Sequence, residues 1–344
     1  MDAALDVVRS GDLGAGEATA AFEEAFAAHL GVRHVVAVAS CTTALHLALL
    51  GLGVGPGDEV IVPSYTFVAT AAAVRYCGAE PVFADVVGPR APSLDPERVA
   101  ALLTPRTRAV ICVHFAGYAA AVHELRALCD AHGAALVEDA AHAPAARSTR
   151  GAALGSVGAV GCFSLFTNKV LSVGEGGMLS TDDPAIAAFA RSPPPGFGAR
   201  IDDPRSALAS SRLGGLTADV AHRRRLTHRY RALLADVEGV TLPFAAADVD
   251  DSSCYVMPVM LEDPALQVGV RTGMSRRHAV QTSLLYPAIH EFTAYRDRRP
   301  RLPLPQTERC ARSEITLPLF PHMTPGQQDR VVTALDDELR RAGR

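Results

Sequence analysis

Lysine is almost absent from this sequence. Its 344 residues include 33 lysines and arginines, and only one of these, Lys169, is a lysine. Because arginine stays protonated at any physiological pH, Lys169 is the one strongly basic side chain that can lose its proton and attack a carbonyl group. The glycine-rich stretch Gly174-Glu175-Gly176-Gly177 follows it closely. Lys169 is therefore a candidate for Schiff-base chemistry, with a surface lysine of no function as the alternative.

Other absences each exclude a class of protein. The seven cysteines form no C-x-x-C pair, and their odd number fits reduced thiols better than a disulfide framework or a zinc site. No apolar run reaches the length of a membrane-spanning helix, and the acidic start Met1-Asp2-Ala3 does not resemble a signal peptide. A net charge of -4 gives no reason to expect binding to nucleic acid or to a membrane surface. We therefore expect a cytoplasmic protein without a metal site.

Short apolar runs alternate with segments of helical periodicity through residues 17–191. Continuous apolar strands that alternate with helices are typical of a mostly parallel sheet covered by helices on both faces. Sheets of this kind bind ligands at the carboxyl ends of their strands. The sequence therefore predicts an α/β fold with its site at that edge. The strands are predicted at residues 34–38, 59–62, 81–84, 108–113, 134–137 and 158–163.

Several polar and aromatic residues follow these strands directly, so we expect them to converge on one pocket. At Thr42 a strand, a small polar turn and a helix start succeed one another, and free N–H groups at such a point can bind a phosphate. Capping of the helix by Ser40 is an equally good interpretation. The residues expected in the pocket are Cys41, Thr42, Phe67, His114, Asp139 and Ser164.

The chain changes character in its last third. A long arginine-rich helix is predicted over residues 205–237, and we interpret its run of basic residues at 222–225 as a solvated face rather than an anion site. Strands at 255–260 and 281–287 and helices at 267–278 and 324–341 then indicate a smaller α+β domain. We therefore divide the chain into a large domain (1–204), a linking helix (205–237) and a small C-terminal domain (238–344).

Asp139 stands at the end of a buried strand, where a carboxylate needs a partner. A pyridinium N–H is a good partner, because the pair keeps the ring nitrogen of pyridoxal phosphate (PLP) protonated. Capping of a following helix is the alternative. The order of the residues along the chain carries more weight than Asp139 or Lys169 alone. A candidate phosphate-binding turn, an aromatic residue and an acid precede Ser164 and Lys169 in that order.

With these residues in order, the sequence resembles the DegT/StrS family of PLP-dependent sugar aminotransferases, which have fold type I of the aspartate aminotransferase superfamily. The resemblance covers nearly the whole chain. Its most specific part is the run Glu138-Asp139-Ala140-Ala141-His142, followed at the family's spacing by Ser164 and Lys169. The other matching stretches, each weak alone, are residues 39–47, 63–67, 113–118, 281–290 and 317–321.

The resemblance implies a role for each matching residue. Lys169 would form the Schiff base with PLP and then act as general base and acid. Asp139 would hold the pyridine nitrogen, and His142 would lie near the phenolic oxygen. Phe67 would stack on the ring. The phosphate contacts would come from Cys41, Thr42 and Ser164.

The substrate side of the resemblance is less complete. Tyr286 and His290 match a loop on the substrate side. The family's segment that ends in Gly-Tyr-Asn-Tyr-Arg crosses to the neighbouring subunit, where its asparagine helps to close the phosphate site. Here the segment is shortened: Gly198 stands in place of the asparagine, Ala199 in place of the second tyrosine, and Arg200 still matches. The resemblance thus implies a homodimer whose partner-subunit contribution is altered.

From these features we expect an aminotransferase that moves an amino group from glutamate or glutamine to a ketone of a nucleotide-linked sugar or a cyclitol. Such chemistry serves natural-product or surface-sugar biosynthesis. One alternative keeps PLP but changes the reaction to dehydration, aromatisation or C–C bond chemistry. The other alternative is a degenerate subunit without catalysis, against which the intact Lys169 and Asp139 count.

Overall fold

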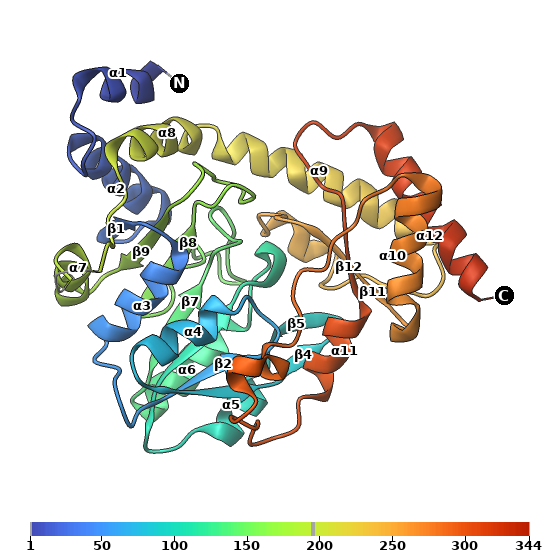
Figure 1. Ribbon diagram of the computed structural model, residues 1–344, viewed down its shortest axis with the longest axis horizontal. Helices are drawn as coiled ribbons and strands as arrows, with labels where there is room; N and C mark the ends of the chain where they lie inside the picture. The colour runs from blue at the N-terminus through green and yellow to red at the C-terminus, as the bar shows by residue number, and fades with distance from the viewer. Residues whose placement is uncertain (1, 194–196, 344) are drawn as a thin grey trace.

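The computed structural model of the protein describes residues 2–193 and 197–343. A seven-stranded sheet dominates the first part of the chain (Figure 1). Its strands are β1 (His34–Val38), β2 (Glu59–Pro63), β3 (Glu80–Ala84), β6 (Thr107–Val113), β7 (Ala135–Asp139), β8 (Val160–Ser164) and β9 (Gly177–Thr181). They lie in the order β1-β9-β8-β7-β6-β2-β3, and β9 runs opposite to the other described strands of this sheet. The predicted mostly parallel sheet is confirmed.

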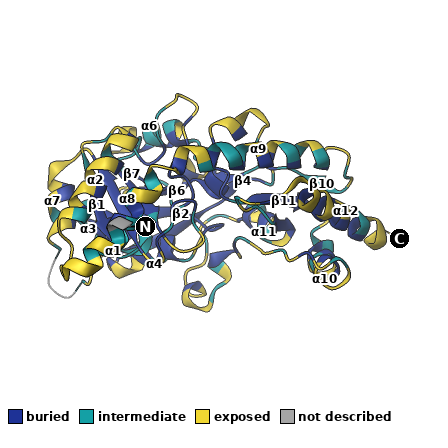
Figure 2. Ribbon diagram, turned by 90° about the horizontal axis from the view of Figure 1, so that it is seen from above, coloured by how far each residue is buried: buried dark blue, intermediate teal, exposed yellow. Residues whose placement is uncertain are grey.

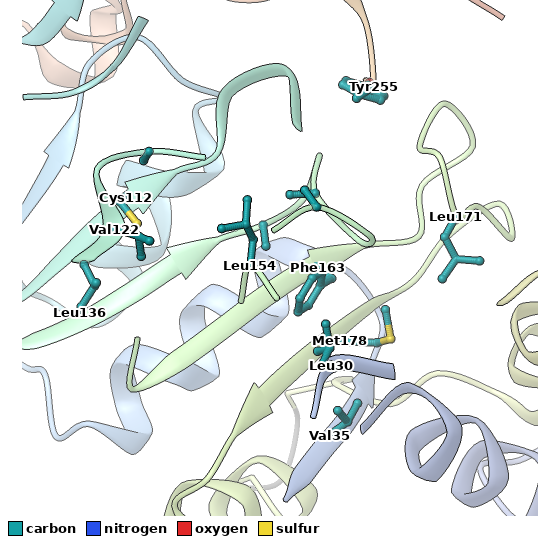
Figure 3. Packing of buried hydrophobic residues seen from close by; sticks show 14 of the residues in the cluster. Leu30, Val35, Cys112, Val122, Leu136, Leu154, Phe163, Leu171, Met178 and Tyr255 are labelled. Carbon is teal, nitrogen blue, oxygen red and sulfur yellow. The ribbon is translucent and has the colours of Figure 1, made fainter. Parts of the chain in front are cut away.

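Side chains of each strand alternate between two cores, one on each face of the sheet. In β6, for example, Cys112 belongs to the first core and Ile111 to the second. Figure 3 shows part of the first core, where Phe163 of β8 lies on the same side of the sheet as Leu30. Helices α2 (Glu17–Leu30), α5 (Pro96–Leu102), α6 (Val122–His132) and α8 (Asp203–Leu213) cover the first core, and α3 (Cys41–Gly51), α4 (Ala69–Tyr76) and α7 (Pro184–Arg191) cover the second.

The C-terminal part forms a third core on a small antiparallel sheet. Its strands lie in the order β10 (Val240–Thr241), β11 (Met257–Leu261) and β12 (Glu314–Leu317). Helices α10 and α12 pack on this sheet at the end of the molecule away from α2 (Figure 1). Figure 2 shows exposed residues concentrated on the outer helices and buried ones on the strands between them. The remaining elements are α1 (Asp2–Ser10), β4 (Val86–Gly88), β5 (Ala91–Leu94), α9 (Leu216–Leu234), α10 (Gln267–His278), α11 (Pro305–Ser313) and α12 (Pro325–Ala342).

The single helix predicted over residues 205–237 is two helices, α8 and α9. They are separated by Gly214 and Gly215, and each glycine lowers helix stability by roughly 1 kcal/mol relative to alanine. Helix α9 does connect the two parts, because its first half contributes Val220 to the first core and its second half contributes Tyr230 to the third. The domain boundaries at residues 204 and 237 stay a prediction.

The predicted strand at 281–287 is also wrong. Within it Ser283 alone pairs with β12, opposite Thr316. The N–H of Leu285 donates to the Glu314 side chain instead of a neighbouring strand, and Pro287 has no N–H to donate. This loop, residues 280–290, therefore runs irregularly from the small sheet towards the large one.

In the part of the chain that the structure describes, no helix is both long and apolar enough to cross a membrane. The cytoplasmic location inferred from the sequence stays a prediction.

Candidate active site

A cavity of about 650 Å³ lies at the carboxyl ends of the parallel strands, between the large sheet and the loop at 280–290. Most of the residues predicted for the site line it. Arg200, His290 and His114 do not. Those that line it are Cys41, Thr42, Phe67, Asp139, His142, Ser164, Lys169 and Tyr286.

Lys169 lies in a turn just after β8, where its N–H donates to the carbonyl oxygen of Phe166 (2.8 Å). Its Nζ lies 4.6 Å from the ring centre of Tyr255. Burial lowers the pKa of the amine from 10.5 to about 8, and the nearby Cys41 and Asp139 groups oppose this lowering. A lysine with such a pKa is partly neutral at physiological pH, so it can act as a nucleophile and as a base.

Asp139 is the last residue of β7, and only 6% of it is exposed. Its Oδ2 accepts a hydrogen bond from Thr70 Oγ1 (3.0 Å), and its Oδ1 accepts one from the N–H of Ala141 (3.2 Å). Burial raises the pKa of the carboxyl, while these two hydrogen bonds and Lys169 lower it. Turns rather than a helix follow Asp139, so it caps no helix. Both hydrogen bonds come from uncharged groups, and a buried carboxylate of this kind suits a cationic N–H donor.

The N-terminus of α3 opens into the same cavity through Cys41 and Thr42. The Ser40 side chain caps the helix by accepting from the N–H of Thr43 (3.1 Å). The N–H groups of the first helical residues have no acceptor inside the helix, and together with the helix dipole they favour an anion. Capping by Ser40 is therefore confirmed, and it does not exclude an anion at the same helix start, which stays a prediction.

This helix start is held at close range by Gly177 of β9. A Cβ added at Gly177 would lie 2.5 Å from the backbone nitrogen of Cys41, which real Cβ atoms essentially never do. We expect Gly177→Ala to push the start of α3 away from the sheet, to destabilise the protein by about 1–3 kcal/mol and to weaken phosphate binding. Denaturant unfolding and titration with PLP measure the two effects. Gly269→Ala is the control, because nothing lies within 4 Å of that added Cβ.

Three rings, those of His142, Tyr255 and Tyr286, pack together in the wall of the cavity. His142 stacks on Tyr255 with 4.2 Å between ring centres, and its Nε2 lies 2.9 Å from the hydroxyl of Tyr286. Phe67 lies at the edge of this group, 6.4 Å from the Tyr286 ring, and 56% of it is exposed. Its exposed ring is free to stack on a planar ligand.

Two residues that the resemblance placed on the substrate side, His290 and Arg200, do not line the cavity. His290 anchors the loop at 280–290, because its Nδ1 lies 2.7 Å from Ser64 Oγ and its N–H donates to the same oxygen (3.1 Å). Arg200 is exposed and pairs with Val38 beside β1. Neither contact reaches the cavity. Their assignment to substrate binding stays a prediction.

The cavity is also lined by Tyr255 and Arg223, neither of which the sequence indicated. Arg223 belongs to the basic run interpreted as a solvated face, yet it is buried, lines the cavity and donates from Nη1 to the carbonyl oxygen of Tyr255 (3.2 Å). No sequence signal separates it from its basic neighbours, because its burial depends on a loop about thirty residues away. Tyr255 was predicted to begin a strand at 255–260, whereas β11 begins at Met257 and Tyr255 lies in the loop before it. No signal in the sequence indicated this.

The site combines a lysine amine of lowered pKa, a buried carboxylate and a helix N-terminus that favours an anion. This combination fits a phosphorylated aldehyde with a basic ring. A sequence model of the DegT/DnrJ/EryC1/StrS aminotransferase family matches residues 1–336, and the chain belongs to this family. The protein is accordingly a PLP-dependent aminotransferase.

Solved structures agree with this assignment. The aminotransferase TlmJ from Streptoalloteichus hindustanus is 34% identical, with 100% of this chain and 96% of that chain covered and a TM-score of 0.92. DesV of S. venezuelae, solved with a ketimine intermediate, is 36% identical, with 98% and 93% covered and a TM-score of 0.90. DesI, solved in the presence of its TDP-sugar product, is 34% identical, with 98% and 89% covered and a TM-score of 0.88.

Proposed function

We propose that this aminotransferase moves an amino group from glutamate or glutamine to the keto group of a nucleotide-linked sugar or a cyclitol, within natural-product or surface-sugar biosynthesis. The observation that carries the proposal is the shape of the site. The cavity with Lys169 adjoins a second hollow of about 560 Å³, with which it shares Val256, Ser283 and Leu319. A sugar at the lysine and a carrier group in the adjoining hollow would fill both. The TDP-sugar product of DesI is a ligand of this kind.

The described residues fit PLP as its cofactor. When bound, PLP supplies an electron-withdrawing ring that lets an amino group pass between two substrates. The unpaired carboxylate of Asp139 would keep a proton on the ring nitrogen. The start of α3, with the hydroxyls of Thr42 and Ser164, would hold the phosphate, and Cys41 would contribute its backbone N–H. Phe67 would cover one face of the ring.

Lys169 would act twice in this scheme. Its amine would bind the aldehyde carbon while no substrate is present. Once a substrate amine displaces it, Nζ would hold a proton and carry it between the substrate carbon and the cofactor carbon. The lowered pKa of about 8 supports both roles, because a neutral amine is available near physiological pH.

A homodimer also belongs to this proposal, and the shortened segment is where its interface would differ from the family pattern. Residues 194–196 of the segment lie outside the described residues. After them, the carbonyl oxygen of Ala199 accepts from the N–H of Ala39 (2.8 Å), so this part follows β1 of its own chain. Gly198 stands where the family has the asparagine that reaches the partner's phosphate site. We therefore expect more of the phosphate binding to come from within each subunit.

The test is an absorbance spectrum of the protein with PLP, followed by addition of L-glutamate or L-glutamine. We expect conversion of the bound cofactor to pyridoxamine phosphate and release of one equivalent of the matching 2-oxo acid. The Lys169→Ala protein, which lacks the amine, should show neither change. If the unmodified protein binds PLP but forms no 2-oxo acid with any amino donor, transamination of these substrates is wrong and the alternative PLP chemistries gain support.

A further inference from the structure

His142 and Tyr286 come from different parts of the chain and meet in the wall of the cavity. His142 follows β7 of the large sheet, while Tyr286 belongs to the loop at 280–290. Their rings are nearly parallel, at an angle of 4° with centres 6.0 Å apart, and both side chains are buried. The imidazole is also stacked on Tyr255. This packing leaves the imidazole little freedom to turn.

The hydrogen bond between the two side chains has a definite direction. Burial raises the pKa of Tyr286 well above its usual value and lowers that of His142 well below 6.5, so the phenol keeps its proton and the imidazole is neutral. Within the described residues His142 Nε2 is the one acceptor within reach of the Tyr286 hydroxyl. The hydroxyl therefore donates to Nε2. A neutral imidazole that accepts at Nε2 carries its hydrogen on Nδ1.

Among the described residues, no atom accepts this hydrogen on Nδ1. His142 Nδ1 is buried and has no hydrogen-bond partner among the described residues, although the residue lines the cavity. Buried N–H groups without an acceptor are rare and costly. Because His142 lines the cavity, an oxygen or nitrogen atom of a ligand bound there would supply the acceptor.

We propose that Tyr286 is a positioning residue: its hydroxyl fixes the Nδ1–H tautomer of His142, and that N–H donates to the phenolic oxygen of bound PLP. This rests on the proposed placement of PLP in the cavity. The resemblance put His142 near that oxygen and Tyr286 on the substrate side. The hydrogen bond instead makes Tyr286 act on the cofactor through His142.

The loop that presents Tyr286 is fixed from both sides, as a positioning role requires. Before Tyr286, the N–H of Leu285 donates to Glu314 Oε2 (2.8 Å). After it, the N–H of Ile289 donates to the carbonyl oxygen of Ser64 (2.9 Å). The Tyr286 ring also packs edge-on against Tyr65, at 6.2 Å between centres. The hydroxyl is thereby held at the imidazole before any ligand binds.

The tautomer can be measured without cofactor. In ¹⁵N-histidine-labelled protein free of PLP, we expect nitrogen NMR to show His142 protonated at Nδ1, with its signals identified by their loss in His142→Gln. In Tyr286→Phe, which keeps the ring, the two tautomers should mix. A His142 protonated at Nε2 in the unmodified protein, or an unchanged spectrum in Tyr286→Phe, would overturn the proposal.

The effect on the cofactor is measured by PLP affinity in a double-mutant cycle. Loss of one neutral hydrogen bond predicts that Tyr286→Phe weakens PLP binding about threefold to tenfold and shifts the visible absorbance of the complex. A glutamine at position 142 can donate without help from a phenol, so in His142→Gln the same change should alter affinity by less than about twofold. Equal losses in both backgrounds would show a merely structural role for Tyr286 and refute its action through His142.

Tyr65→Phe is the matched control. Tyr65 is a buried neighbour of Tyr286 whose hydroxyl has no hydrogen-bond partner among the described residues, so we expect no change in the His142 tautomer or in PLP affinity. Neither measurement involves amino transfer. A failure of this proposal is therefore distinct from a failure of the proposed substrates.

Discussion

Lys169→Met is expected to abolish amino transfer and at the same time to make the cofactor-free protein more stable. Loss of the nucleophile and of the proton carrier removes about 10⁴-fold or more of the rate. The gain in stability follows from the burial that lowers the amine's pKa to about 8. Between pH 8 and about 10.5, this lysine is protonated in the unfolded chain and largely neutral in the folded one. The free energy of unfolding therefore rises with pH through this window.

Below pH 8 the whole cost of the buried amine is present. One pKa unit corresponds to about 1.4 kcal/mol, so we expect Lys169→Met to stabilise the cofactor-free protein by about 1–3 kcal/mol at pH 7 and by less at pH 10. Denaturant unfolding at both pH values measures this. Lys169→Arg is the control, because arginine keeps the charge at both pH values and should lose the activity without the gain. A gain in stability over the unmodified protein that is no larger at pH 7 than at pH 10 would contradict the assigned burial.

The elements that carry the site could be predicted from the sequence because their signals are local. Lys169 and Asp139 each follow an apolar strand, and strand ends of a parallel sheet meet at one edge whatever the rest of the chain does. Thr42 stands at a strand–turn–helix junction, whose anion-binding property is a backbone effect. These three residues therefore converge as expected in one cavity.

What could not be predicted depends on contacts between distant segments. Arg223 is buried only because the loop before β11 places the Tyr255 carbonyl against it. Tyr286 contacts His142 across more than one hundred residues, and no periodicity in its loop indicates this. Residues 281–287 were predicted as a strand, but the Glu314 side chain takes the N–H of Leu285 that a neighbouring strand would need. In each case a tertiary hydrogen bond overrides the local pattern.

Asp139→Asn is expected to have the second largest effect on catalysis. Like Lys169→Met, it should lower activity without lowering the stability of the cofactor-free protein. The amide cannot form a charged hydrogen bond with a protonated ring nitrogen, so we expect amino transfer to fall about 100- to 1000-fold and PLP binding to weaken. In the cofactor-free protein the carboxyl's pKa is raised by burial, so the folded chain binds more protons than the unfolded one just above pH 3.8. Stability therefore falls as pH rises through that window.

Without PLP at pH 7, the Asp139→Asn variant should therefore be at least as stable as the unmodified protein. Added PLP should stabilise this variant less than it stabilises the unmodified protein. Asp85 provides the contrast, because this equally buried carboxylate accepts from the N–H groups of Gln306 (3.1 Å) and Thr307 (2.7 Å). Asp85→Asn should lower stability with and without PLP alike, since both of its oxygens accept from backbone N–H groups and an amide offers one oxygen. At Asp139 one of the two donors is the Thr70 hydroxyl, which can also accept from an amide N–H. Thermal unfolding of both variants with and without PLP separates the two cases. If Asp139→Asn destabilised the cofactor-free protein as Asp85→Asn does, the carboxylate would belong to the fold rather than to the cofactor.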